Sequence, residues 1–180
     1  MNNGSGNLLL AANFRSGKVD VFDRTFKATS LAGSFTDPCL PAGFAPHGIH
    51  ILGNRVFVAY ALQDAAKHDS VNGAGNGVVD IFDANDNFVS RFATAGPLNS
   101  PWGVVGAPTG FGQFANAILV GNFGDGTINA FDNSGNSLGQ LADPGGHPQV
   151  NPGLWDLVFG PSSSDANTLY FTAGGADQTQ

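Results

Sequence analysis

The chain has 180 residues, of which 42% are hydrophobic and only 12% are charged, so it can bury a core and is not a disordered segment. Its 14 acidic and 7 basic residues give a formal net charge of −7, which repels phosphate backbones, so nucleic acid is not expected as a partner. No apolar run approaches the roughly 20 residues that span a bilayer, and residues 1–12 lack the basic start and cleavage site of a signal peptide.

One phrase recurs along the chain and predicts β-strands. Its three copies are GKVDVFD at 17–23, GVVDIFD at 77–83 and GTINAFD at 126–132. Each copy starts at a turn glycine, alternates as a half-buried strand does, and stops at an aspartate followed by polar turn formers. We expect Phe22, Phe82 and Phe131 to occupy equivalent places on successive sheets and to be buried between them.

We label the strand of this phrase c. Three further kinds of strand, a, b and d, surround it, and along the chain the four kinds follow the order a, b, c, d. Apolar runs of type b lie at 8–14, 55–61, 117–123 and 167–173. Runs of type a lie at 45–52, 100–107 and 153–160, and runs of type d at 27–35, 87–94 and 136–143. The unit recurs every 53–55 residues, which is slightly longer than the period of a four-stranded β-propeller blade.

We therefore predict an all-β fold, a partial β-propeller of the NHL or six-bladed type. Residues 1–180 form a single domain whose blade segments cover about 7–36, 45–95, 100–143 and 153–175. Its strands amount to about three blades, whereas propellers close with about four to eight. The prediction is an open arc that exposes apolar faces at both ends, so self-association through the terminal blades is expected.

The anchors of the a strands are the main candidates for a binding site. Strand a lines the central channel of a propeller, so His47, Trp102 and Trp155 should surround one end of that channel, with Asp156 beside them. Rings and polar groups in such a mouth can bind a protein, a glycan or a small molecule. The alternative is that each ring packs on the neighbouring blade.

Asn13 and Asn122 recur in the phrase NF before a turn. Their amides either form that turn or face the channel as contacts to a ligand or a metal. The acidic runs at 83–87 and 124–126 suggest Ca²⁺ only weakly, because they lack the spaced ligands of an EF-hand. No other cofactor is expected.

The longest loop covers residues 63–77 and carries Asp64, His68 and Asp69. These side chains either meet as a carboxylate–imidazole site or remain solvated. Cys39 is the only cysteine, which excludes an intrachain disulfide, and its DPCLP setting is typical of a loop rather than of a catalytic thiol.

Several stretches, among them APHGIHILGNRVFVAYALQDAAKHD and GFGQFANAILVGNFGDGTINAFD, resemble an uncharacterised bacterial family of secreted NHL-like β-propellers, some of which carry a PEP-CTERM sorting tail. The resemblance covers nearly the whole chain and implies about six blades and an extracytoplasmic location: periplasmic, secreted or cell surface. Because the family's chains are longer at both ends, this chain looks like a segment of one. It departs from the family pattern at Asp156, where glycine is usual, and at His47, where an aromatic residue is more frequent.

Two functions remain open. The first is a non-catalytic propeller of the bacterial cell surface or periplasm that binds a ligand or a protein. The second is a metal-dependent hydrolase or lactonase of the six-bladed kind, in which Asn13, His47, Asn122 and Asp156 would hold a divalent cation. The first is favoured because the a-strand positions are more aromatic than acidic and no hydrolase motif is present.

Overall fold

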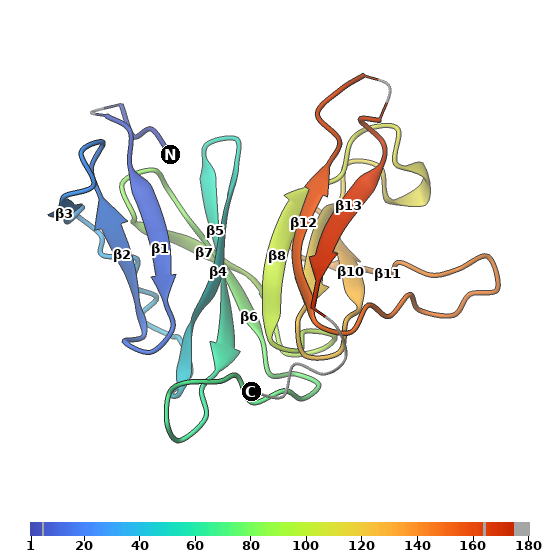
Figure 1. The fold of residues 1–180 in the computed structure, drawn as a ribbon, viewed down its shortest axis with the longest axis horizontal. Helices are drawn as coiled ribbons and strands as arrows, with labels where there is room; N and C mark the ends of the chain where they lie inside the picture. Colours follow the sequence, from blue (N-terminus) through green and yellow to red (C-terminus); the bar gives the residue numbers. More distant parts are fainter. Residues whose placement is uncertain (5, 164, 175–180) are drawn as a thin grey trace.

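The computed structural model describes residues 1–4, 6–163 and 165–174. Within them, thirteen strands form four small antiparallel sheets that stand in a row (Figure 1). In each sheet the strands are hydrogen-bonded to one another in chain order. The predictions of an all-β fold, of the strand types and of their a, b, c, d order are therefore confirmed.

The four sheets contain three, four, four and two strands. The first sheet consists of β1 (Leu9–Asn13), β2 (Lys18–Phe22) and β3 (Ala28–Thr29). The second consists of β4 (Phe44–Leu52), β5 (Arg55–Leu62), β6 (Val78–Phe82) and β7 (Phe88–Thr94). The third consists of β8 (Pro101–Gly106), β9 (Ile118–Asn122), β10 (Ile128–Phe131) and β11 (Ser137–Gln140). The fourth consists of β12 (Leu154–Phe159) and β13 (Leu169–Ala173).

The a strands of neighbouring sheets lie side by side. Strand β4 contacts β8, and β8 in turn contacts β12. Glycine makes this approach close: a Cβ at Gly103 would stand 3.0 Å from the Trp155 carbonyl oxygen, and one at Gly48 would overlap the Trp102 carbonyl. Because these glycines directly follow His47 and Trp102 in the chain, the close approach also brings together the anchor residues of successive sheets.

The core consists of three apolar clusters, one between each pair of neighbouring sheets. Phe82 and Phe131 are 0% and 2% exposed and occupy matching places, paired with Val56 and Ile118 at the start of the neighbouring strand. Phe22 occupies the same place opposite Leu9 but is only half-buried. The expectation of burial is therefore confirmed for two rings and wrong for Phe22, because no sheet among the described residues covers the outer face of the first sheet.

The aspartate that ends each c strand forms the following turn. In all three copies its Oδ1 accepts hydrogen bonds from the backbone N–H groups two and four residues later, at distances of 2.8–3.1 Å. Side-chain hydrogen bonds from Thr25, Asn87 and Asn136, together with these backbone bonds, lower the pKa of Asp23, Asp83 and Asp132. The repeated FD phrase therefore encodes a strand and the turn that reverses it.

Two segments differ from the sequence prediction. The d strand expected over 27–35 is reduced to Ala28–Thr29: the chain has left the sheet before it reaches positive φ at Ser34 and Phe35, where it packs the Phe35 ring on Phe82. A short 3-10 helix, Gly112–Phe114, interrupts the loop before β9 and buries Phe114.

Candidate functional site

Five rings from all four sheets gather at one place. They are Phe14 after β1, His47 in β4, Trp102 in β8, Phe123 after β9 and Trp155 in β12. Trp102 lies between His47 and Trp155, with ring centroids 4.6 Å apart on either side and interplanar angles of 73° and 88°. The structure thus brings together the three anchors that the sequence singled out.

The two phenylalanines extend this cluster. Phe14 lies 5.2 Å from His47, and Phe123 lies 4.8 Å from Trp155 and 5.9 Å from His47, measured between ring centroids. Both follow the asparagine of the NF phrase, whose amide the sequence analysis considered while leaving the ring out. The repetition of NF after two b strands was the signal that pointed to the rings.

His47 is the most buried polar member of the cluster, at 7% exposure. Its Nδ1 donates to the carbonyl oxygen of Pro101, 3.0 Å away, so Nε2 is the unprotonated nitrogen of the neutral ring. Burial lowers the pKa of His47 to about 4, against the smaller opposing effect of the Pro101 carbonyl. The imidazole is therefore neutral at pH 7.

The long loop 63–77 closes over these rings. The five rings and four loop residues, His68, Asp69, Ser70 and Asn72, line a cleft of about 420 Å³, which we call the aromatic cleft. His68 Nδ1 lies 3.2 Å from Asp69 Oδ2, so these two side chains meet as the sequence suggested. Asp64 instead serves the loop backbone, since its Oδ1 accepts from the N–H of His68 at 2.8 Å.

Asn99, which the sequence analysis did not consider, holds the loop in place. Its Oδ1 accepts from the backbone N–H of Gly73 at 2.7 Å, and its Nδ2 donates to Asp125 Oδ2 at 3.0 Å. Asn99 is 7% exposed. Loop 63–77 is thereby anchored to the turn that precedes β10.

Asp156 was expected beside the tryptophans in the mouth. Successive strand residues point to opposite faces, and its carboxylate lies 3.7 Å from His50 Nδ1 without lining the aromatic cleft. His50 Nε2 donates to the Trp102 carbonyl oxygen at 3.1 Å. Burial lowers the pKa of His50, although Asp156 and the Trp102 carbonyl act in the opposite direction. His50 and Asp156 thus connect three neighbouring a strands.

Asn13 acts in the turn after β1, which is one of the two roles that the sequence left open, whereas Asn122 links the end of β9 to the segment 97–99 before β8. Asn13 donates to Asp20 Oδ2 at 2.8 Å and accepts from the N–H of Ser16. Asn122 is 0% exposed; its Oδ1 accepts from the Asn99 N–H, and its Nδ2 donates to the Pro97 carbonyl at 2.8 Å. The four residues proposed as ligands of one cation, which are Asn13, His47, Asn122 and Asp156, therefore each bind different partners.

The acidic runs at 83–87 and 124–126 form turns between strands. Asp83 accepts from the backbone at 85 and 87, and Asp125 accepts from the N–H and hydroxyl of Thr127. Among the described residues, no three His, Cys, Asp or Glu side chains gather as a metal site. Cys39 is an exposed loop residue.

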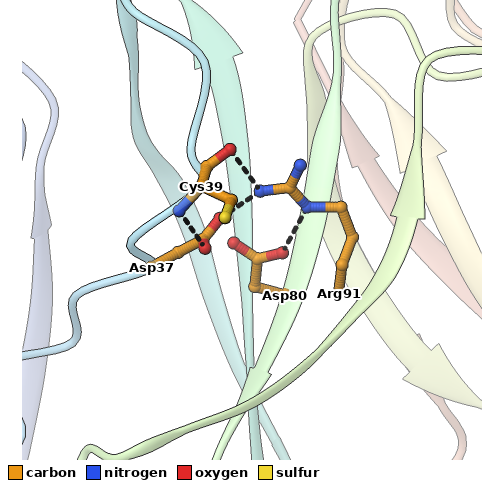
Figure 2. A network of polar contacts seen from close by, with 4 residues as sticks. All are labelled: Asp37, Cys39, Asp80 and Arg91. Carbon is orange, nitrogen blue, oxygen red and sulfur yellow. Dashed lines mark hydrogen bonds and ion pairs between the residues drawn. The ribbon is translucent and has the colours of Figure 1, made fainter.

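A second polar cluster, which sequence reasoning missed, joins the loop between β3 and β4 to strands β6 and β7 of the second sheet (Figure 2). The Arg91 guanidinium binds the carboxylates of both Asp37 and Asp80, whose side chains are 0% exposed, and donates to the Cys39 carbonyl. Burial, together with the nearby Asp37, raises the pKa of Asp80 to about 7 despite the Arg91 partner. The signal in the sequence was the polar residue repeated within each c strand: Asp20, Asp80 and Asn129.

In the part of the chain that the structure describes, no helix has the length and apolar character needed to cross a membrane.

Comparison with known proteins relates the chain to uncharacterised viral proteins and to one bacterial structure. No protein-family model matches the chain. It is homologous to uncharacterised proteins of Acanthamoeba polyphaga mimivirus, with 35% identity over 174 residues to one and 32% over 180 residues to another. These matches cover 94% and 97% of the chain but 43% and 47% of the relatives, so the chain spans less than half of their length. A crystal structure of a protein of unknown function from Bacteroides caccae shares the fold, with a TM-score of 0.52 at 10% identity over 87% of this chain and 47% of that one.

Proposed function

We propose that this chain is part of a non-catalytic, ligand-binding β-propeller that works outside the cytoplasm. The location rests on the resemblance to secreted bacterial NHL-like propellers. The propeller architecture is supported by the row of sheets whose a strands lie side by side through Gly48 and Gly103. Further sheets of the same kind, in a longer protein, would close the ring.

The aromatic cleft is the observation that carries this proposal. Its rings come from all four sheets, so the cleft is a product of the whole fold and not of one loop. Trp102, Trp155, Phe14 and Phe123 are only partly buried, which leaves ring surface for a ligand. Loop 63–77 adds exposed hydrogen-bonding groups at the rim, where His68 and Asp69 are 69% and 64% exposed.

This combination fits a neutral ligand that has both apolar and hydroxylated surfaces, such as an oligosaccharide. Aromatic rings pack against the apolar faces of such a ligand, and a few polar groups orient it. The formal charge of −7 does not favour an anionic ligand. We therefore name a neutral glycan as the class of ligand.

Tryptophan fluorescence tests this proposal directly, because the only two tryptophans of the chain are Trp102 and Trp155, both in the cleft. Titration with cellohexaose, chitohexaose and xylohexaose should shift or quench the emission with at least one of them. Trp155→Ala should remove binding of that sugar as measured by calorimetry. Phe26→Ala changes an aromatic residue that is 76% exposed and outside the cleft, and should leave binding unchanged.

Two results would contradict the proposal. One is binding that survives the loss of both tryptophans, which would place the sugar elsewhere. The other is the absence of binding across a broad panel of neutral glycans, which would remove this class of ligand.

A further inference from the structure

A second cavity, of about 450 Å³, lies between the first and second sheets, away from the aromatic cleft. Its apolar wall includes Val21, Leu31 and Phe35. The volume falls within the roughly 300–1,000 Å³ that small-molecule sites occupy. We call it the inter-sheet cavity.

Two buried polar atoms at this cavity have no hydrogen-bond partner among the described residues. They are the hydroxyl of Tyr60 and Oδ2 of Asp86, on residues that are 2% and 1% exposed. The other oxygen of Asp86 accepts from the backbone N–H of Gly33, which fixes the orientation of the carboxylate. Because leaving a buried polar atom unsatisfied costs free energy, a bound molecule that pairs with either atom would stabilise the fold.

The charges around the cavity favour a cation. Asp86 has no cationic partner among the described residues. Asp37 also lines the cavity, but it shares the single guanidinium of Arg91 with Asp80 (Figure 2). The one basic residue that lines the cavity in the described part of the chain is Lys18, at the exposed start of β2.

We propose that the inter-sheet cavity binds a small organic cation, a protonated primary amine with a short apolar body. The ammonium group donates to Asp86 Oδ2, and the apolar body packs against Leu31 and Phe35. A neutral alcohol of the same size would pair with Tyr60 but leave the Asp86 charge unpaired. The negative net charge of the chain also attracts cations toward the surface.

Calorimetry and thermal unfolding of the full chain at constant ionic strength test this assignment with three probes of equal length. Butylammonium chloride should bind and raise the Tm as its concentration increases, since a ligand of the folded state stabilises it. 1-Butanol and sodium butyrate should do neither at the same concentrations. The emission of Trp102 and Trp155 should stay unchanged, which separates this site from the aromatic cleft.

Two variants locate the site. Asp86→Asn keeps an oxygen for the Gly33 N–H but loses the charge, and should weaken butylammonium binding about tenfold or more. Tyr60→Phe removes only the unpartnered hydroxyl, so it should fold, and it should leave butylammonium binding unchanged because the ammonium group binds at Asp86. Asp132→Asn makes the same change as the first variant at a turn of the third sheet, and should have no effect.

Three results would overturn the proposal. They are the absence of butylammonium binding, equal binding of 1-butanol, and binding that Asp86→Asn does not weaken.

Discussion

His47 stands edge-on to Trp102 with 4.6 Å between ring centroids, while its Nδ1 donates to the Pro101 carbonyl of the same neighbouring strand. This packing is what keeps the imidazole neutral. Burial lowers its pKa to about 4 in the folded state, compared with about 6.5 in an unfolded chain. As the pH falls from about 6.5 to 4, the unfolded state therefore takes up a proton that the folded state does not. The free energy of unfolding should decrease by up to ~3 kcal/mol over this range from His47 alone.

Asp80 acts in the opposite direction over nearly the same range. Its pKa is raised to about 7 in the folded state, so between about pH 4 and 7 the folded state keeps a proton that the unfolded state loses. The contribution of Asp80 to stability therefore falls as the pH rises. We predict that Asp80→Asn steepens the loss of stability on acidification, whereas His47→Gln reduces or reverses it. Urea unfolding of both variants between pH 4 and 7.5 checks this, and identical slopes for the two variants would show that neither pKa is shifted as described.

Phe82→Ala should lower the free energy of unfolding by about 3–5 kcal/mol, because it removes a fully buried ring from the cluster between the first two sheets. Phe22→Ala is the matched control, since Phe22 occupies the same place in the repeat but is half-buried. Chemical denaturation should show a clearly smaller loss for Phe22. A loss below about 1 kcal/mol for Phe82 would mean that its ring is exposed in solution.

Gly103→Ala should destabilise the chain by about 1–3 kcal/mol, because its Cβ would meet the Trp155 carbonyl and force β8 and β12 apart. The same shift moves Trp102 relative to Trp155, so the tryptophan emission should change as well. Gly6→Ala introduces a Cβ into open space and serves as the control. If Gly103→Ala matches Gly6→Ala in both stability and emission, the close approach of the two strands does not exist in solution.

The strands and the gathering of the anchor rings could be predicted because they depend on local periodicity and on the repeat. The alternation in GVVDIFD predicts a strand. His47, Trp102 and Trp155 stand at equivalent positions of the repeat, which predicts that they lie at the same end of neighbouring sheets. The contact of loop 63–77 with these rings could not be predicted, because it depends on Asn99, far along the chain, reaching back to Gly73. The ion pair of Asp37 with Arg91 likewise joins residues 54 positions apart, with no repeat to mark it.

The fourth sheet exposes side chains whose equivalents are buried elsewhere. Tyr170 of β13 is 48% exposed, whereas Leu119, at the matching place in β9, is 0% exposed. Val158, which pairs with Tyr170, is 58% exposed. In the third sheet the matching residue packs against the next sheet. Among the described residues no further sheet covers Val158 and Tyr170, so the fourth sheet presents an exposed apolar face.

We predict that the isolated chain self-associates through this face, because burying apolar area contributes roughly 25 cal/mol per Å². Multi-angle light scattering should show a mass that increases with concentration. The double variant Val158→Lys, Tyr170→Lys should return the chain to a monomer, because like charges would then oppose each other across the contact. Val89→Lys, at a residue of β7 that is 57% exposed, is the control and should leave the association unchanged. A monomer at all concentrations, with a cooperative thermal transition, would show that the exposed face of β13 is stable in water without a partner.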